Sequence, residues 1–253
     1  MPLTVITLHC REDNYGYILR DDTTGSTAVV DAPEAAPLIA ALDEKGWGLD
    51  LILVTHHHFD HVDGVEALRE KYGAEVVGAA ADAKRLPALD IAVGEGDTVA
   101  LGESTARVID VSGHTVGHIA FLFDGHAFTA DSLMALGCGR VFEGTHLMMW
   151  DSLSKFLTLP PETQIYSGHN YGAANGRFAL SIEPDNAALA DRIAQIAAAD
   201  EAGEAICPVS LAEELATNPF LRATEDSVKA AVGLAGADDA AVFAEVRRRQ
   251  DSF

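Results

Sequence analysis

Four consecutive aliphatic residues, Leu51-Ile52-Leu53-Val54, narrow the choice of fold more than any other feature of the chain. A strand without polar alternation is buried on both faces, as in a parallel sheet covered by helices. Short runs rich in Val, Ile and Thr surround it, and Ala35–Lys45 has helical spacing and stops before Gly46. The sequence therefore predicts an α/β fold for its first part.

The same alternation continues over about 170 residues. A second helix is expected at Val62–Tyr72, and further strands at Leu3–Leu8, Tyr15–Leu19, Ala28–Asp31, Glu75–Val77, Thr98–Leu101, Ala106–Val111, His118–Phe123, Ala127–Thr129 and Ile165–Tyr166. From about Gly172 the strand pattern fades, and Ala-rich helices are expected at Pro184–Ala199, Leu211–Ala216, Glu225–Val232 and Asp238–Arg249. We therefore predict two domains, residues 1–171 and residues 172–253.

The net charge of −22, from 17 basic and 39 acidic side chains, restricts the partners of this chain. DNA, RNA and anionic membrane surfaces repel it at long range. No apolar run is long enough for a transmembrane helix, and no secretory signal is visible. Cys10, Cys138 and Cys207 are odd in number and widely spaced, so they predict neither a disulfide framework nor a cysteine metal site. We expect a cytoplasmic monomer.

The segment directly after the aliphatic run has the pattern His-x-His-x-Asp-His, formed by His56, His58, Asp60 and His61. Ligands of α/β sheets bind at the carboxyl ends of strands. Side chains two residues apart in extended backbone point the same way, so His56 and His58 can share one ion while His57 points away. Asp60 and His61 can reach a second ion. A solvated histidine-rich loop would lack both the aspartate and the preceding strand.

Three later residues, His114, Asp131 and His169, also follow β-rich runs. Taken singly, they read as a turn histidine, a helix N-cap and a core histidine. Together with the first motif they give five histidines and two aspartates, a donor set that suits Zn²⁺, Fe or Mn²⁺. Structural zinc sites are usually rich in cysteine, whereas catalytic sites keep a position for water. The set therefore favours catalysis.

At this point the chain resembles the metallo-β-lactamase superfamily, and four further segments narrow the resemblance to the glyoxalase II (hydroxyacylglutathione hydrolase) family. They are Asp13-Asn14-Tyr15, the stretch from Gly137-Cys138-Gly139-Arg140 to Thr145, Tyr166-Ser167-Gly168-His169-Asn170-Tyr171, and Asn218-Pro219-Phe220-Leu221-Arg222. The resemblance covers nearly the whole chain. It implies an αββα sandwich followed by a C-terminal all-helical domain.

The resemblance also implies two divalent ions per chain, zinc first, with iron or manganese as alternatives. The first ion is held by His56, His58 and His114, the second by Asp60, His61 and His169, and Asp131 bridges the two. For glutathione the implied contacts are Arg140, Phe142, Tyr171, Arg247 and Gln250. Phe142 and Gln250 stand where the family has a tyrosine and a lysine. Each replacement removes a hydrogen-bond donor or a charge.

The implied reaction is hydrolysis of an S-acyl glutathione thioester, with S-D-lactoylglutathione as the model substrate, as in methylglyoxal detoxification. A hydroxide that bridges the two metals attacks the carbonyl, and Asp60 orients it. One metal stabilises the oxyanion. The thiolate leaves without a general acid, since a thiol pKa is about 8.5. A cysteine nucleophile such as Cys138 is not required.

Three alternatives stay open. The chain could be another hydrolase of this superfamily (a lactonase, a β-lactamase or a ribonuclease), although its charge disfavours nucleic acid. It could be a persulfide dioxygenase, with one iron on a subset of the same ligands, or a metal-binding protein without catalysis. His118 is left between a hydrogen-bonding support for a ligand and a buried strand residue.

Overall fold

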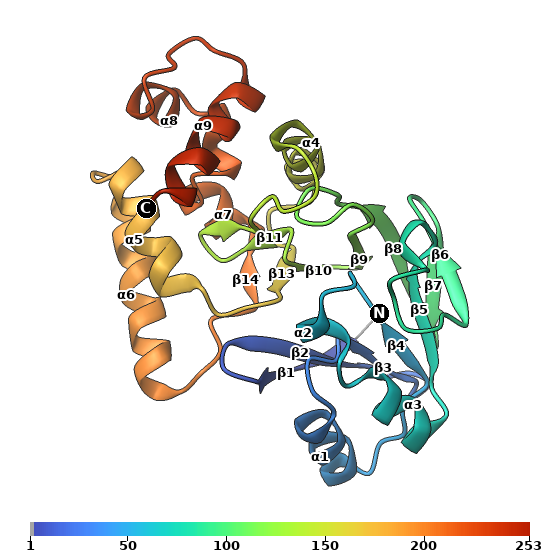
Figure 1. The fold of residues 1–253 in the computed structure, drawn as a ribbon. Coiled ribbons are helices and arrows are strands. Elements are labelled where there is room, and N and C mark those ends of the chain that lie inside the picture. Colours follow the sequence, from blue (N-terminus) through green and yellow to red (C-terminus); the bar gives the residue numbers. More distant parts are fainter. Residues whose placement is uncertain (1–2) are drawn as a thin grey trace. The chain divides into compact units, whose positions relative to one another are not determined.

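The computed structural model describes residues 3–253, which form two compact units (Figure 1). Unit 1 runs to Asp110 and resumes over Gly117–Ala130; unit 2 consists of Val111–Val116 and Asp131–Phe253. No helix within residues 3–253 is long and apolar enough to cross a bilayer.

The first sheet of unit 1 has six strands in sequence order. They are β1 (Leu3–Cys10), β2 (Asn14–Asp21), β3 (Thr27–Val30), β4 (Leu51–Leu53), β5 (Glu75–Ala79) and β6 (Ile91–Val93). The first three pair antiparallel, and β3 to β6 pair parallel. Every residue of β4 is buried, which confirms the burial on both faces that its aliphatic sequence predicts.

Helices connect the parallel strands of this sheet. They are α1 (Ala35–Lys45), α2 (Phe59–Val62), α3 (Val65–Tyr72) and the 3₁₀ turn η1 (Ala80–Asp82). The helix α1 has the predicted bounds and ends at Gly46, whose left-handed φ of 65° suits glycine. The helix predicted at Val62–Tyr72 corresponds to α3, which begins three residues later, at Val65 after Gly64, while α2 ends at Val62. A Cβ at Gly64 would lie 2.6 Å from the backbone nitrogen of Ala35, so this close approach requires glycine.

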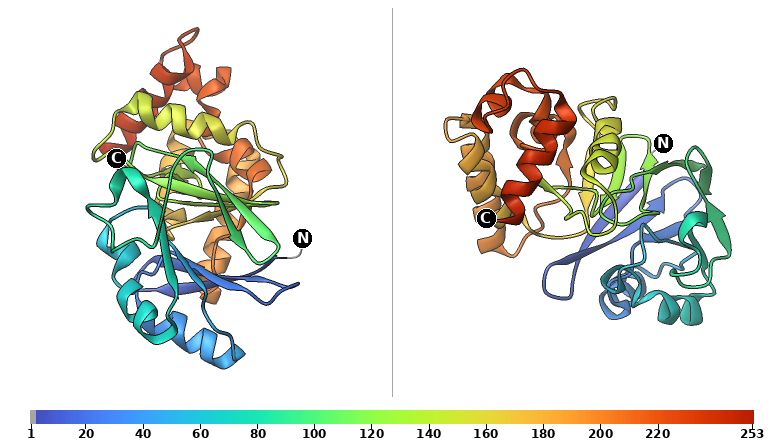
Figure 2. Two further views of the ribbon diagram at one scale, coloured as in Figure 1. Left: turned by 90° about the vertical axis from the view of Figure 1, so that its right-hand side faces the viewer. Right: turned by 45° about the horizontal axis from the view of Figure 1, so that its top comes forward.

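Four antiparallel strands follow in unit 1, drawn in green in Figure 2. They are β7 (Thr98–Leu101), β8 (Ser104–Asp110), β9 (Ile119–Phe123) and β10 (His126–Ala130). The ring of Tyr17 on β2 packs edge-on against Phe128 on β10, with centroids 5.6 Å apart. This buried aromatic contact joins the two sets of strands within unit 1.

Unit 2 is mostly helical. Its helices are α4 (His146–Phe156), α5 (Gly172–Ile182), α6 (Ala187–Ala202), α7 (Leu211–Thr217), α8 (Asp226–Ala231), α9 (Asp239–Asp251) and the 3₁₀ turn η2 (Leu221–Thr224). Its strands are β11 (Leu133–Met134), β12 (Gly137–Cys138), β13 (Gln164–Ser167) and β14 (Val209–Ser210). Phe220 lies at the centre of its core, in ring contact with Phe178 and Phe243.

Two helices of unit 2, α4 and α5, are absent from the sequence-based expectation. Gly172 and Gly176 lower the helix propensity of α5. The structure uses both for close packing, because a Cβ at Gly172 would lie 2.5 Å from Ile206 and one at Gly176 would lie 2.9 Å from Ile193. The helix α6 begins at Ala187, three residues later than predicted, since the side chain of Asn186 caps it by accepting from the Leu189 amide.

One buried carboxylate closes the turn after β2. The side chain of Asp21 accepts hydrogen bonds from the amides of Thr23, Thr24 and Ser104 and from the hydroxyls of Thr24 and Ser104, at 2.7–3.0 Å. These donors, the Ser104 hydroxyl above all, hold the pKa of Asp21 well below its usual range. Asp21 therefore ties the β2–β3 turn to the start of β8.

The substitution Asp21→Asn is expected to lower the Tm of the protein at pH 7. The side-chain nitrogen of asparagine would face N–H and O–H donors, from which it cannot accept a hydrogen bond. The difference should begin to shrink below about pH 4, because the carboxyl of the unfolded wild type then takes up a proton while that of the folded protein stays ionised. Thermal unfolding at pH 7 and at pH 3.5 measures this. The exposed neighbour Asp22→Asn is the control, and equal Tm losses for the two variants would contradict the assignment.

Candidate metal centre

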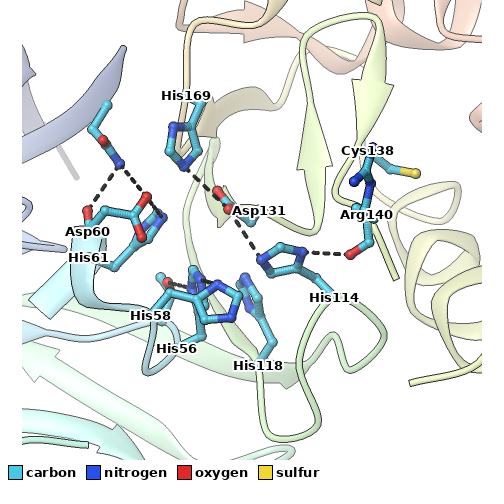
Figure 3. Close-up of polar contacts among 12 residues, drawn as sticks. His56, His58, Asp60, His61, His114, His118, Asp131, Cys138, Arg140 and His169 are labelled. Atoms are coloured by element: carbon cyan, nitrogen blue, oxygen red, sulfur yellow. Dashed lines mark hydrogen bonds and ion pairs between the residues drawn. The ribbon is translucent and has the colours of Figure 1, made fainter. Parts of the chain in front are cut away.

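One group of candidate metal ligands lies in unit 1, where the chain leaves β4 (Figure 3). The Thr55 hydroxyl donates to Asp31 at 2.8 Å, so its oxygen accepts from Nδ1 of His56 at 3.1 Å. Nε2 of His56 is then free of a proton and lies 3.1 Å from Nδ1 of His58. Two nitrogen ligands of one tetrahedral zinc ion lie about 3.3 Å apart, given bonds of about 2.0 Å. The spacing of this pair therefore fits a shared cation.

His61 and Asp60 come next along the same loop. Nδ1 of His61 donates to the Asp31 carboxylate at 2.8 Å, which leaves Nε2 without a proton and 3.8 Å from an oxygen of Asp60. The Asn14 amide donates to the carbonyl and the carboxylate of Asp60, at 3.0 and 3.1 Å. His61 is completely buried. Ligand atoms of Asp31, His56 and His61 lie within 4.8 Å of one another.

The other two histidines of unit 1 near this loop have separate partners. His57 turns away from the loop as predicted, and its Nδ1 lies 2.8 Å from the buried carboxylate of Asp82, which also pairs with Arg85. His118 is fully buried and stacks on the ring of His56, with centroids 4.5 Å apart and planes at 13°. Its Nδ1 lies 3.1 Å from the Ile119 carbonyl oxygen.

Another group of candidate ligands lies in unit 2, where His114, Asp131 and His169 are all at most 5% exposed. One oxygen of Asp131 lies 3.4 Å from Nε2 of His114 and 3.4 Å from Nε2 of His169 (Figure 3). Nδ1 of His114 donates to the Arg140 carbonyl at 2.7 Å, so its Nε2 carries a lone pair. These distances again match neighbouring ligands of one cation, and the donors fit the imidazole and carboxylate set that zinc, iron and manganese accept.

Glycine is required where the chain passes the candidate ligands of unit 2. A Cβ at Gly139 would collide with the carbonyl oxygen of Asp131 and would lie 2.9 Å from Nδ1 of His114. A Cβ at Gly137 would lie 2.5 Å from the side-chain amide of Asn175. The sequence Gly137-Cys138-Gly139-Arg140 thus owes its glycines to close packing. Cys138 is buried, and burial raises the pKa of its thiol to about 11, so it is not a thiolate at neutral pH.

Three predicted glutathione contacts are exposed near these ligands of unit 2. The Arg140 side chain is 59% exposed, with Nε 3.6 Å from Asp251. The Phe142 ring lies 5.3 Å from that of His114, and the Tyr171 ring stacks on His169 at 4.7 Å.

The other two predicted contacts, Arg247 and Gln250, have partners inside unit 2. Arg247 is 4% exposed, donates to the carbonyl of Cys138 at 3.0 Å and pairs with Asp251 at 2.9 Å. Gln250 donates to the side-chain oxygen of Asn175 at 3.0 Å. Their role toward glutathione stays a prediction.

Sequence reasoning missed the groups that orient the ligands: Asp31, Thr55, Asn14 and the Arg140 carbonyl. Asp31 directly follows β3, which pairs parallel with β4, so both strands end at the same edge of the sheet. That pairing would have placed Asp31 beside the metal-binding loop. No sequence pattern marks the carbonyl of Arg140, because any residue supplies one.

Comparison with known proteins assigns residues 14–253 to described families. Residues 14–169 match the family described as the metallo-beta-lactamase superfamily, and residues 170–253 match the hydroxyacylglutathione hydrolase C-terminus. Proteins named hydroxyacylglutathione hydrolase from Cereibacter sphaeroides and Ruegeria pomeroyi are 58% and 56% identical, and each covers the full length of both chains.

Solved structures agree on the fold. The ETHE1 protein from Myxococcus xanthus has a TM-score of 0.68 and 26% identity, and covers 98% of this chain and 99% of its own. The BLEG-1 B3 metallo-beta-lactamase has a TM-score of 0.63 and 22% identity, and covers 87% of this chain and 99% of its own. The predicted fold class, a metallo-β-lactamase αββα sandwich with a C-terminal helical domain, is therefore confirmed. The chain belongs to the hydroxyacylglutathione hydrolase family of the metallo-β-lactamase superfamily.

Proposed function

We propose that this protein hydrolyses S-acyl glutathione thioesters, with S-D-lactoylglutathione as the model substrate and glutathione and D-lactate as products. The observation that carries the proposal is the two groups of candidate ligands, in each of which a hydrogen bond to one ring nitrogen of a histidine fixes the orientation of the ring. Full-length relatives at more than 50% identity are named for this activity.

The histidine and aspartate cluster binds divalent metal. We propose two ions per chain, zinc in the first place. His56, His58 and His114 would hold one, Asp60, His61 and His169 the other, with Asp131 shared between them. Asp131 suits the shared position because a single carboxylate oxygen already lies equally far from two histidine nitrogens.

When bound, the metals lower the pKa of a coordinated water toward neutrality and polarise the thioester carbonyl. Asp60 would accept a hydrogen bond from the attacking water and orient it, and Asn14 fixes the Asp60 carboxylate for that task. The departing thiolate needs no proton donor, because a thiol pKa is about 8.5. No buried acid of the chain is assigned to that step.

For the substrate, Arg140 would attract a glutathione carboxylate, while Phe142 and Tyr171 would contact its body. Arg247 and Gln250 remain proposed members of this region. We further propose the domain division 1–171 and 172–253, and a cytoplasmic monomer without nucleic-acid or membrane partners, which the charge of −22 supports.

Metal analysis and steady-state assay of one sample test the proposal. We expect two divalent ions per chain and hydrolysis of S-D-lactoylglutathione without oxygen uptake. A chelator should remove metal and activity together, and zinc should restore both. One iron per chain with oxygen consumption would instead support a persulfide dioxygenase, and full metal without any turnover would support a non-catalytic metal protein.

Substitution of a proposed ligand should remove metal as well as turnover. We expect His58→Ala and Asp131→Ala each to lose at least one ion per chain and to reduce kcat by 100-fold or more, on the order of what removing metal-based activation costs. The control is His146→Ala, at the start of α4 and outside the ligand set. A ligand variant with full metal content and normal turnover would refute the two-metal assignment.

Arg140→Ala should raise the KM for S-D-lactoylglutathione about tenfold at unchanged kcat and metal content, since it removes one charged contact to the substrate. The control is Arg177→Ala, another exposed arginine of unit 2, on α5. Equal KM values for the wild type and the Arg140 variant would exclude this contact.

A further inference from the structure

The hairpin of β11 and β12, Leu133–Cys138, is too short to be stable through its own strand pairing. Each strand has two residues, and Leu136 in the turn has a left-handed φ of 57°, which favours glycine. Isolated hairpins are marginal even when they are longer. Contacts from the rest of unit 2 must therefore hold it.

Helices of unit 2 supply those contacts through buried polar side chains. Asn175 on α5 donates to the Ala135 carbonyl at 3.0 Å. Asn218, after α7, donates to the carbonyls of Met134 and Gly137 at 3.2 and 2.9 Å. In the turn itself, the carboxylate of Glu214 on α7 accepts a hydrogen bond from the amide of Leu136 at 3.0 Å.

The hairpin leads directly into the candidate site. Gly139 and Arg140 follow β12, and the Arg140 carbonyl accepts the hydrogen bond that orients the ligand His114. The exposed Arg140 side chain starts from the same residue. A displacement of the hairpin would therefore move a metal ligand and a proposed substrate contact together.

Glu214 is unusual among the groups that hold the hairpin. Its side chain is completely buried, and Oε2 accepts from both the Leu136 amide and the Asn218 side chain, the latter at 2.8 Å. Oε1 has no hydrogen-bond partner within residues 3–253. A buried carboxyl of this kind is costly and is retained only where its contacts matter.

The charged groups near Glu214 act on its ionisation in opposite directions. Arg192 on α6 favours its ionised form, and Glu213 on its own helix opposes it. Cys207, before β14, is buried near it, and burial raises the pKa of that thiol too. Burial dominates, and it raises the pKa of Glu214 to about 7.

We propose that Glu214 is a positioning residue for the reaction: its carboxylate holds the Leu136 amide, and with it the hairpin that orients His114 and carries Arg140. The kinetic part rests on the proposed function, whereas the structural part does not. An ionised carboxylate accepts more strongly than a neutral acid. The hairpin is therefore held more firmly above about pH 7 than below it.

Hydrogen exchange tests the structural part in the metal-loaded wild type. The protection factor corrects the exchange rate for its intrinsic dependence on pH. We expect this factor to rise between pH 6 and pH 8 for the peptide that covers residues 133–140. A peptide from α6 serves as the internal reference. A flat ratio of the two protection factors across this range would overturn the proposal without the need for any variant.

Glu214→Gln keeps the shape of the side chain and removes its charge. At pH 8 we expect about tenfold faster exchange in residues 133–140, from loss of a charge-assisted hydrogen bond, and little difference at pH 6. The KM for S-D-lactoylglutathione should rise at pH 8 and stay near the wild-type value at pH 6. The control is Glu201→Gln, an exposed carboxylate on α6.

The outcomes separate the two proposals. If hydrogen exchange in residues 133–140 depends on pH but no thioester is hydrolysed, the proposed function is refuted and the role of Glu214 in holding the hairpin is supported. Hydrolysis with identical exchange and pH profiles in the wild type and Glu214→Gln would refute the role of Glu214 alone. A Glu214→Gln variant that keeps its metal content but changes both the hydrogen exchange and the pH profile of hydrolysis would support both proposals.

Discussion

The carboxylate of Asp31 accepts hydrogen bonds from the Thr55 amide, the Thr55 hydroxyl and the His61 ring. Through the Thr55 hydroxyl it also determines the proton position on His56. One buried acid thus sets which nitrogen each of two ligands offers to a cation. Asp31 has a left-handed φ of 54°, a conformation that aspartate tolerates better than most residues and that pairing of its amide with Leu53 maintains.

The ligands of unit 2 obtain their orientation differently, from a backbone carbonyl. His114 depends on the Arg140 carbonyl, and the approach of that segment depends on the absence of a side chain at Gly139. A carbonyl oxygen only accepts, so it places a proton on Nδ1 of His114. What can vary is the location of the carbonyl, which the polar side chains of α5 and α7 control.

Much of this architecture could be predicted from the sequence, because the aliphatic run of β4 and the caps of α1 carry local information. Candidate ligands could be proposed from the sequence because metal chemistry limits them to a few residue types at strand ends; that these residues bind metal stays a prediction. The hairpin Leu133–Cys138 could not, since its turn residue Leu136 contradicts local preference and the hairpin is held by side chains of Asn175, Glu214 and Asn218, 40 to 84 positions away. The buried state of Arg247 could not either, because a basic helix end is usually exposed.

The segment Val111–Val116 belongs to unit 2 although unit 1 residues precede and follow it in the chain. No single cut can therefore release either unit intact: cleavage after Ala130 would leave His114 on one fragment and Asp131 on the other. The two units are therefore interleaved along the chain. Every cut between His56 and His169 divides the seven proposed ligands between two fragments, so both fragments would be needed to rebuild the set.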